Sequence, residues 1–371
     1  MSLRGEAATV IGGGVAGLAV ARALAMSGAQ VTLHEQAAEI AEVGAGLQIS
    51  PNGLCVIDAL GVGEALRAVS VKGRAIRLRD HRGGEVLRLD LARHAPDRDY
   101  LFVHRARLIE VLETGARSAG VTIRTGSRID PPGPEGLVIG ADGLHSRIRA
   151  DINGDADPVF TGQVAWRALV ADPDAAPEAQ VFMGPRRHLV TYPLDWGLRN
   201  IVAVEERSGW TAEGWHHEDD PDNVRRAFRG FAPEVSRWLD EIQQVHVWGL
   251  FRHPVADRWH DGCRAILGDA AHPMLPFLAQ GANMALEDAW VLAACLDRLP
   301  RAEALDAYQS RRRDRVVRVI SAASANARNY HLAQPLVRTA AHAALRLGGA
   351  VFPAQALRRF DWLYGHDVTT F

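Results

Sequence analysis

Hydrophobic and polar residues at the start of the chain follow the periods of a strand, a helix and a second strand. A short β-branched run at residues 8–11 leads into three glycines, and an alanine- and leucine-rich segment with helical spacing covers residues 15–26. Gly28 ends this segment, and residues 30–35 return to the two-residue period of a strand. The pattern predicts a βαβ unit of about thirty residues.

The same two periods predict the later elements. They are a loop followed by a helix at 47–70, strands at 74–80, 85–91, 121–129 and 137–140, and helices at 105–119, 282–298 and 303–330. Between residues 160 and 250, short strand-like runs alternate with Pro-, Asp- and Gly-rich loops, with one helix at 222–239. We therefore predict an α/β chain in which a mainly antiparallel sheet is inserted into a nucleotide-binding domain.

These changes of pattern divide the chain into two interleaved domains. The nucleotide-binding domain is predicted from residues 1–72, 104–158 and 256–371, the last of which ends in helices. The inserted β-sheet domain is predicted from residues 73–103 and 159–255.

Composition excludes several classes of protein. The chain has 371 residues, of which 47% are hydrophobic and 23% charged, which supports a sizeable core and excludes wholesale disorder. A net charge of −2 argues against a nucleic-acid partner. No apolar run approaches the ~18 residues that span a bilayer, so we expect no membrane partner. The three widely spaced cysteines form no zinc or redox motif and predict a cytoplasmic protein.

The first candidate site is the glycine-rich turn that opens the first helix. In the G-x-G-x-x-G pattern the glycines permit a tight turn, approach of a pyrophosphate and packing of helix on strand. The acidic residue at the end of the second strand can accept the hydroxyl groups of a ribose. The residues of this site are Gly12, Gly14, Val15, Ala16, Gly17, Glu35 and Gln36. The pattern predicts a dinucleotide site without deciding between NAD and FAD.

Two further motifs follow predicted strands. Asp142 stands in a DG turn after the strand at 137–140, and Asp269 stands in a GD turn after another buried strand. Pro273 and Pro276 stiffen the next loop, which delivers residues 281–283 to a helix N-terminus. The free N–H groups of that terminus can stabilise negative charge on a bound ring. We expect His272 to order this loop, and we expect the run Arg311 to Arg313 to form a solvated face or an interface.

In combination these segments are recognisable. GGGVAGL with Glu35, then GADGLHSRIR, then LGDAAHP and QGANMALEDA resemble the class A flavin-dependent monooxygenases, and most of all the salicylate and hydroxybenzoate hydroxylases. The resemblance extends over nearly the whole chain, through GAGLQISPN at 44–52, HRARL at 104–108, AWRALV at 165–170 and WLYGHDV at 362–368. It implies a Rossmann-like FAD-binding domain of the p-hydroxybenzoate hydroxylase type, a β-sheet substrate domain and C-terminal helices.

The resemblance also implies a role for each matching residue. The glycine turn would hold the FAD pyrophosphate and Glu35 the adenosine ribose, while Asp142 would serve FAD and the nicotinamide nucleotide. Asp269 would bind the ribityl or pyrophosphate region. The residues expected elsewhere along the cofactor are Arg105, the loop Gly44, Ala45 and Gly46 beside the flavin, and Gly281, Ala282 and Asn283 near the isoalloxazine.

The candidate substrate residues are His188 and Tyr192. Residues four apart in a strand point to the same side of the sheet, so imidazole and phenol share a face. The resemblance implies that the histidine helps to deprotonate a substrate phenol and that the tyrosine orients the substrate, whereas a pair that only packs the sheet is the alternative. Gln48 and Pro276 are expected in the pocket, although a proline cannot share in proton transfer.

The implied reaction is a hydroxylation. NADH or NADPH reduces FAD, the reduced flavin reacts with O₂, and the C4a-hydroperoxide transfers OH to a small phenolic or heteroaromatic acid. An epoxidase, an N-hydroxylase and a non-catalytic FAD-binding sensor are the alternatives. We expect a monomer or a homodimer, and no metal.

Overall fold

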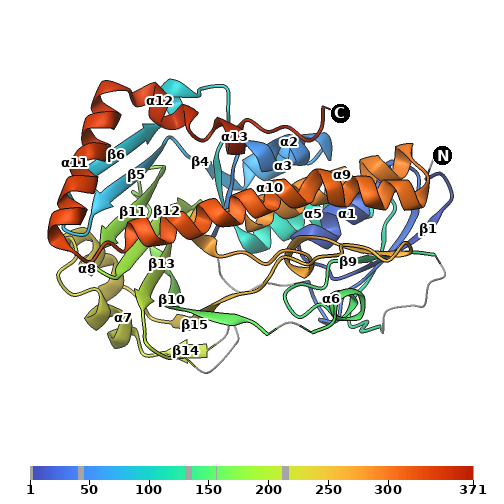
Figure 1. Ribbon diagram of the computed structural model, residues 1–371, viewed down its shortest axis with the longest axis horizontal. Coiled ribbons are helices and arrows are strands. Elements are labelled where there is room, and N and C mark those ends of the chain that lie inside the picture. Colours follow the sequence, from blue (N-terminus) through green and yellow to red (C-terminus); the bar gives the residue numbers. More distant parts are fainter. Residues whose placement is uncertain (1–2, 41–45, 130–135, 156, 211–216, 371) are drawn as a thin grey trace.

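The computed structural model describes residues 3–40, 46–129, 136–155, 157–210 and 217–370. Two large sheets lie at opposite ends of an elongated molecule, and helices cover them (Figure 1). The largest apolar cluster fills the end that holds the parallel sheet. Among the described residues, no helix combines the length and the apolar character needed to cross a bilayer.

The first sheet is parallel throughout and confirms the predicted nucleotide-binding half. Its strand order is β16 (Arg264–Ile266), β9 (Leu137–Gly140), β1 (Ala7–Ile11), β2 (Gln30–His34) and β8 (Thr122–Arg124). Helix α1 (Val15–Met26) joins β1 to β2, as the pattern predicts. Helices α5 (Arg105–Ser118) and α9 (Gly281–Arg298) pack against α1. The strand predicted at 121–129 is short, because only three of its residues pair with β2.

A small antiparallel sheet connects the two large ones. Its order is β3 (Gly46–Ile49), β7 (Leu101–His104) and β4 (Ser70–Lys72), with α2 (Pro51–Ala59) and α3 (Gly63–Ala68) between β3 and β4. The predicted loop and single helix at 47–70 are therefore wrong. A strand forms at the start because it pairs with the distant β7, and Gly61 (φ +70°) lies between the two helices.

The second large sheet confirms the predicted antiparallel insertion. Its order is β14 (His217–Asp219), β15 (Val245–Arg252), β10 (Val159–Ala171), β13 (Leu198–Glu206), β12 (Arg187–Leu194), β11 (Glu178–Gly184), β5 (Ala75–Asp80) and β6 (Glu85–Asp90). Every neighbouring pair is antiparallel except β11 and β5. Strands β5 and β6 come from a separate stretch of chain, so the sheet is assembled from two insertions.

Two helices cover one face of this sheet where the sequence predicts one. Helices α7 (Pro221–Ala227) and α8 (Pro233–Asp240) pack their apolar side chains onto β10, β12 and β13. The single helix predicted at 222–239 is therefore wrong. Gly230 has a φ of +88° and Pro233 starts the second helix, so the backbone turns between them.

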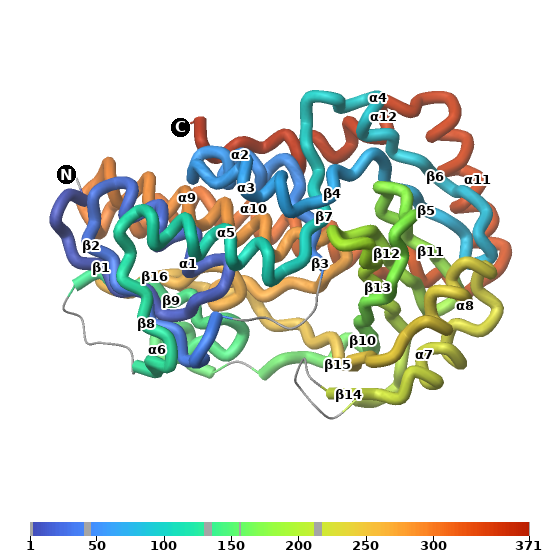
Figure 2. The backbone as a smooth tube through the Cα atoms, turned by 180° about the vertical axis from the view of Figure 1, so that it is seen from behind, coloured from blue at the N-terminus to red at the C-terminus, as the bar shows by residue number. Residues whose placement is uncertain are grey.

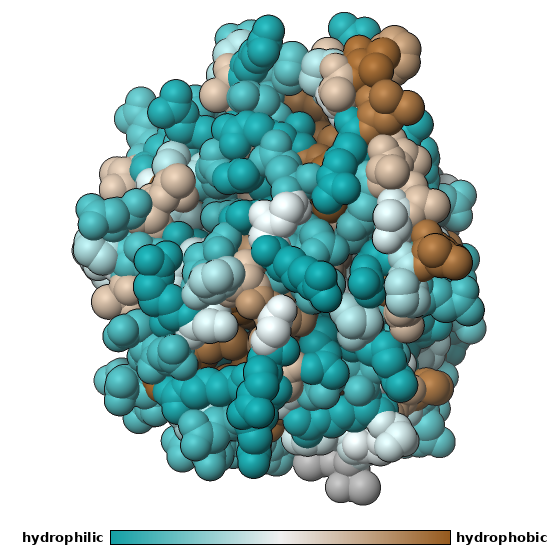
Figure 3. Space-filling model, turned by 90° about the vertical axis from the view of Figure 1, so that its left-hand side faces the viewer, coloured by the Kyte–Doolittle hydropathy of each residue, from teal (hydrophilic) through white to brown (hydrophobic). Residues whose placement is uncertain are grey.

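The C-terminal helices tie the two ends of the molecule together. Helix α10 (Arg301–Tyr330) runs from the parallel sheet to the eight-stranded sheet, as Figures 1 and 2 both show. Helix α11 (Pro335–Val351) then packs along β6. The end of the molecule where α11 lies shows separate apolar patches in Figure 3. The exposed apolar side chains of α11 and its end include Leu336, Val337, Leu347, Val351 and Phe352.

Candidate functional site

The turn between β1 and α1 depends on glycine for close backbone packing. Gly12 has a φ of +106°, and a Cβ there would lie 2.2 Å from the carbonyl oxygen of Ala141. A Cβ on Gly17 would lie 1.9 Å from the carbonyl oxygen of Gly12. Gly14 is the N-cap of α1, makes no side-chain capping bond, and would have nothing within 4 Å of a Cβ. The start of α1 therefore offers the open approach and uncapped N–H groups that suit a phosphate.

Glu35 lies directly after β2 and beside this turn. Its Oε2 accepts a hydrogen bond from the backbone N–H of Gly13 at 2.6 Å, and its Oε1 accepts one from Ala37 at 2.8 Å. The carboxylate is half-buried, whereas the neighbouring Gln36 is exposed. Each carboxylate oxygen has a second lone pair, so Glu35 can still accept hydroxyl groups.

Asp142 stands in the DG turn between β9 and α6 (Arg147–Asn153). Its Oδ2 accepts a hydrogen bond from the backbone N–H of Arg147 at 2.9 Å. Its Oδ1 is buried and has no hydrogen-bond partner among the described residues. A buried acceptor without a partner is costly, and a hydroxyl or amide of a bound dinucleotide would satisfy it.

Arg105 and Asp269 attract one another although they come from distant motifs. Asp269 follows β16 and keeps part of its surface exposed to solvent, although protein atoms pack closely around its carboxyl. The resulting loss of hydration raises the pKa of the Asp269 carboxyl, and the positive charges of His272 and Arg105 partly oppose the rise. Arg105 is the first residue of α5, where burial lowers its pKa and attraction to Asp269 opposes that effect. The HRARL and GD motifs thus present opposite charges to one another.

A cavity of about 70 Å³ lies between the DG segment, the GD segment and β15. Leu144 and His145 of the DG segment line one side, residues 248–251 of β15 and His253 line another, and Asp269 with residues 273–276 completes it. The predicted pocket residue Pro276 therefore borders a cavity that the inserted sheet shares with two nucleotide-binding motifs.

The loop after this cavity leads into α9. Gln280 is the N-cap of α9 and makes no side-chain capping bond. The N–H groups of Gly281 and Ala282, at the positive end of the helix dipole, are therefore not capped by this side chain. The left-handed Ala279 (φ +52°) turns the chain just before. That this helix terminus faces a group that gains negative charge stays a prediction.

Asn283 differs from its neighbours because its side chain is fully buried. Its Oδ1 accepts a hydrogen bond from the backbone N–H of Ser50 at 3.0 Å. Its Nδ2 donates to the carbonyl oxygens of Gln48 at 3.0 Å and Ala279 at 2.9 Å. The amide thus joins α9 to β3, which leaves the backbone N–H of Asn283 for the predicted role beside a cofactor.

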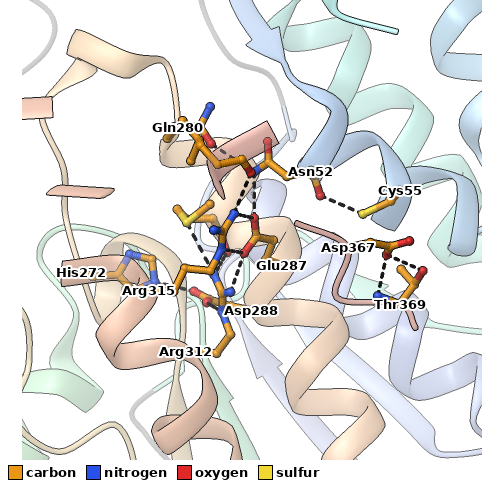
Figure 4. Close-up of polar contacts among 12 residues, drawn as sticks. Asn52, Cys55, His272, Gln280, Glu287, Asp288, Arg312, Arg315, Asp367 and Thr369 are labelled. Carbon is orange, nitrogen blue, oxygen red and sulfur yellow. Dashed lines mark hydrogen bonds and ion pairs between the residues drawn. The ribbon is translucent and has the colours of Figure 1, made fainter. Parts of the chain in front are cut away.

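A buried ionic cluster lies behind this helix terminus (Figure 4). Glu287 and Asp288 of α9 are fully buried, and Arg312 of α10 pairs with them at 2.5 and 2.7 Å. Arg315 contacts Glu287 at 2.7 Å, and His272 contacts Asp288 at 2.5 Å. Burial would raise the pKa of Asp288, but attraction to His272 and Arg312 outweighs it and lowers the pKa to about 2.

This cluster overturns one prediction and agrees with another. Arg312 belongs to the run 311–313, which the sequence predicts as a solvated face or an interface, yet only 1% of its side chain is exposed because it is buried against α9 of its own chain. The helical period turns Arg312 toward α9, whereas the adjacent Arg313 pairs with the exposed Asp257. His272 is buried against Asp288 and orders the loop, as expected.

His188 and Tyr192 lie on one face of β12, as their spacing predicts, and both are buried. A Cβ on Gly46 would lie 2.6 Å from the Tyr192 ring and 2.9 Å from Asn200, so these side chains fill the space at Gly46. The loop predicted to lie beside the flavin comprises Gly44, Ala45 and Gly46, and the first two of these lie outside the described residues. Burial raises the pKa of Tyr192 while Arg167, Gln48 and Asn200 oppose it, so the phenol stays protonated.

His188 has a different set of neighbours. Its Nδ1 lies 2.6 Å from Nε2 of His331, directly after α10. The ring centroids of Phe277 and Tyr330 lie 5.6 and 5.2 Å from that of His188, so the histidine faces the loop that precedes α9. Burial and the neighbouring positive charge of His331 lower the pKa of His188 well below its usual value. No motif in the sequence points to His331, because its partner is 143 residues away.

The glycine turn, the DG and GD motifs and the sheet beside them define a dinucleotide-binding enzyme with an adjoining pocket. A family model described as "FAD binding domain" matches residues 6–131 and 136–323. The chain belongs to this family, and it is an FAD-dependent monooxygenase. The uncapped α1 terminus and the unsatisfied oxygen of Asp142 fit that cofactor.

Individual relatives agree with this assignment. The chain is 34% identical to 3-amino-4-hydroxybenzoate 2-monooxygenase PtmB3 of Streptomyces platensis, with 97% of this chain and 96% of the relative covered. It is 31% identical to 3-hydroxybenzoate 6-hydroxylase of Klebsiella oxytoca, with 96% of each covered. A salicylate hydroxylase substrate complex has a TM-score of 0.79 at 25% identity, with 98% of this chain and 96% of that chain covered.

Proposed function

We propose that this monooxygenase hydroxylates a small phenolic or heteroaromatic acid, with His188 as the base and Tyr192 as an orienting group. The observation that carries the proposal is a buried histidine whose lowered pKa keeps it neutral, on the same strand face as the tyrosine. A neutral imidazole can accept the proton of a substrate phenol. The resulting phenolate is more electron-rich and reacts more readily with an electrophilic oxygen. The named relatives that act on hydroxybenzoates support this class of substrate.

FAD supplies the redox and oxygen-transfer chemistry when it is bound. We propose that the start of α1 holds its pyrophosphate, that Glu35 accepts the ribose hydroxyls, and that α9 faces the ring through its N-terminus. The further residues proposed to contact it are Gln36, Gly46, Arg105, Asp142 and Asp269. NADH or NADPH is the proposed reductant. The protein's own task is to orient the substrate and exclude water.

Arg167 is the proposed partner of the substrate carboxylate. It lies on β10, its charge acts on Tyr192, and its guanidinium lies 5.0 Å from the Trp248 ring centroid. Its buried Nε has no hydrogen-bond partner among the described residues. A planar guanidinium binds a carboxylate through two parallel hydrogen bonds, so Arg167 could fix one end of the acid beside Tyr192.

The test is a screen of the FAD-loaded enzyme. Salicylate, 3-hydroxybenzoate, 3-amino-4-hydroxybenzoate and 6-hydroxynicotinate are each supplied with NADH or NADPH, and oxygen consumption and product mass are measured. We expect at least one acid to stimulate reductant oxidation and to gain one oxygen atom, while its carboxamide reacts far more weakly. If the enzyme binds FAD but no phenolic or heteroaromatic acid gains oxygen, the proposal is wrong.

We also propose a cytoplasmic location and a monomer or homodimer. The three cysteines are free, which suits a reducing compartment. The exposed apolar side chains of α11 offer a surface through which two copies could pair.

A further inference from the structure

Two side chains, His331 and Glu206, connect His188 to the surface of the substrate domain. The Nδ1 of His188 lies 2.6 Å from Nε2 of His331, and Nδ1 of His331 lies 3.0 Å from Oε1 of Glu206. Only 1% of His188 is exposed, whereas the Glu206 side chain is 30% exposed. Glu206 also lines an open surface depression of about 410 Å³. The three groups come from β12, the residue after α10, and β13, and they form a continuous path from the interior to solvent.

The carboxylate at the end of the path determines where the imidazole protons lie. An ionised carboxylate only accepts hydrogen bonds, so Nδ1 of His331 must carry a proton toward Glu206. A neutral His331 then has an unprotonated Nε2, which accepts a hydrogen bond from a protonated Nδ1 of His188. A neutral His188 is therefore left with an unprotonated Nε2, which is the nitrogen needed to accept a phenolic proton.

Burial makes the same path necessary for proton removal. Burial lowers the pKa of His188, and the charge of His331 lowers it further, so an imidazolium at His188 is costly. Burial also lowers the pKa of His331, although Glu206 opposes this effect. His188 must therefore release its Nδ1 proton to His331 while its Nε2 accepts the proton of the substrate.

We propose that His331 and Glu206 form a proton relay that fixes the tautomer of His188 and carries the substrate's phenolic proton to solvent. This inference rests on the proposed function of His188. In the forward step the phenol O–H bond breaks and its proton binds Nε2 of His188. The Nδ1 proton of His188 moves to Nε2 of His331, and the Nδ1 proton of His331 moves to Glu206. The products are a phenolate, two neutral histidines and a protonated Glu206, which releases its proton to water.

The groups around the relay are mainly positive. Arg186 pairs with Glu206 at 3.0 Å, and Arg187 lowers the pKa of His331 by its charge. Gln163 of β10 lies 3.3 Å from Nδ1 of His331, and the Tyr330 ring of α10 lies tilted against that of His188, with their centroids 5.2 Å apart. Arg207 also lines the depression at Glu206. These cations surround the carboxylate at the solvent end of the relay.

The first test reads the tautomers without any substrate. In ¹⁵N-histidine-labelled holoenzyme, imidazole nitrogen shifts should show Nδ1–H and bare Nε2 for both histidines, assigned by the loss of signals in His188→Phe and His331→Phe. Glu206→Gln keeps an acceptor and should keep these tautomers, whereas Glu206→Leu should mix them. Glu205→Leu is the matched control, because Glu205 is adjacent on β13 and pairs with Arg187 instead. Opposite tautomers in the wild type, or no change in Glu206→Leu, would overturn the proposed relay.

The second test measures proton transfer with 4-hydroxy-3-nitrobenzoate, whose phenolate is coloured. After mixing with oxidised holoenzyme, phenolate should form about 10-fold or more slowly in Glu206→Gln and His331→Phe than in the wild type, and at the wild-type rate in Glu205→Leu. If His331→Phe does not fold, Glu206→Gln decides, because Glu206 is at the surface. Equal rates in Glu206→Gln and the wild type would overturn the relay alone. Absence of any phenolate in the wild type would instead count against the proposed function, and the tautomer measurement would still decide the relay's geometry.

Discussion

Replacing Arg312 by methionine tests whether the buried ionic cluster behind α9 holds the cofactor end of the molecule together. Arg312 bridges Glu287 and Asp288, and all three side chains are buried to 99% or more. Methionine has a similar length but carries no charge, so both carboxylates lose a partner in a low-dielectric interior. Breaking a buried pair from one side costs about 3–5 kcal/mol, because the remaining charges stay desolvated.

The expected change in melting temperature follows from the size of the chain. An unfolding entropy of about 2.1 cal/mol/K per residue gives about 0.8 kcal/mol/K for 371 residues. The loss from Arg312→Met therefore corresponds to a fall of about 4–6 °C. The assay is thermal unfolding at one saturating FAD concentration, since bound cofactor adds its own stability.

The adjacent Arg313 provides a matched control on the same helix. It pairs at 3.2 Å with Asp257, whose side chain is 91% exposed, so Arg313→Met should cost about 1 kcal/mol or less. That loss is about 1 °C in melting temperature. If the two variants melt within about 1 °C of each other, the cluster does not stabilise the fold in the way the geometry indicates.

Three further predictions concern the glycine turn, acid stability and the base. Gly17→Ala should lower the melting temperature of the apoprotein, because its Cβ would meet the carbonyl of Gly12, whereas Gly14→Ala should leave that temperature unchanged and weaken only FAD binding in titrations. The pKa of Asp288 is lowered to about 2, so its stabilisation is complete above its unfolded pKa and is lost as pH falls from about 4 to about 2. Urea unfolding should show this loss, about 2 kcal/mol, in the wild type but not in Asp288→Asn; parallel pH profiles would contradict it. His188→Ala should retain FAD and lose coupled hydroxylation about 100-fold or more, and an unchanged rate would leave His188 a packing residue.

The fold was largely predictable because its signals are local. The strand, glycine turn and helix at residues 8–26 use the two periods that a short window of sequence displays. The errors fall where distant contacts decide. β3 forms because β7 pairs with it, and the helix expected at 222–239 divides at Gly230. Neither effect is visible in the hydrophobic pattern of the segment itself.

The positions of the candidate cofactor residues in the fold were predictable to a similar extent. Asp142 and Asp269 each follow a strand, and parallel strands bring such ends to one edge of the sheet. The sequence does not show that the Asn283 side chain turns inward to Ser50 and Gln48. An asparagine near a helix N-terminus can face either side, and the packing of α9 against β3 decides which.

By itself, the sequence determined the βαβ unit, the order of the three nucleotide-binding motifs and the shared strand face of His188 and Tyr192. Only the tertiary structure decided that His331 and Glu206 extend from His188 to the surface, and that Arg312 is buried while Arg313 is half-exposed. The physical reason is that backbone periods and turn preferences act over a few residues. Burial and proton position depend instead on groups that the folded chain brings together from distant segments.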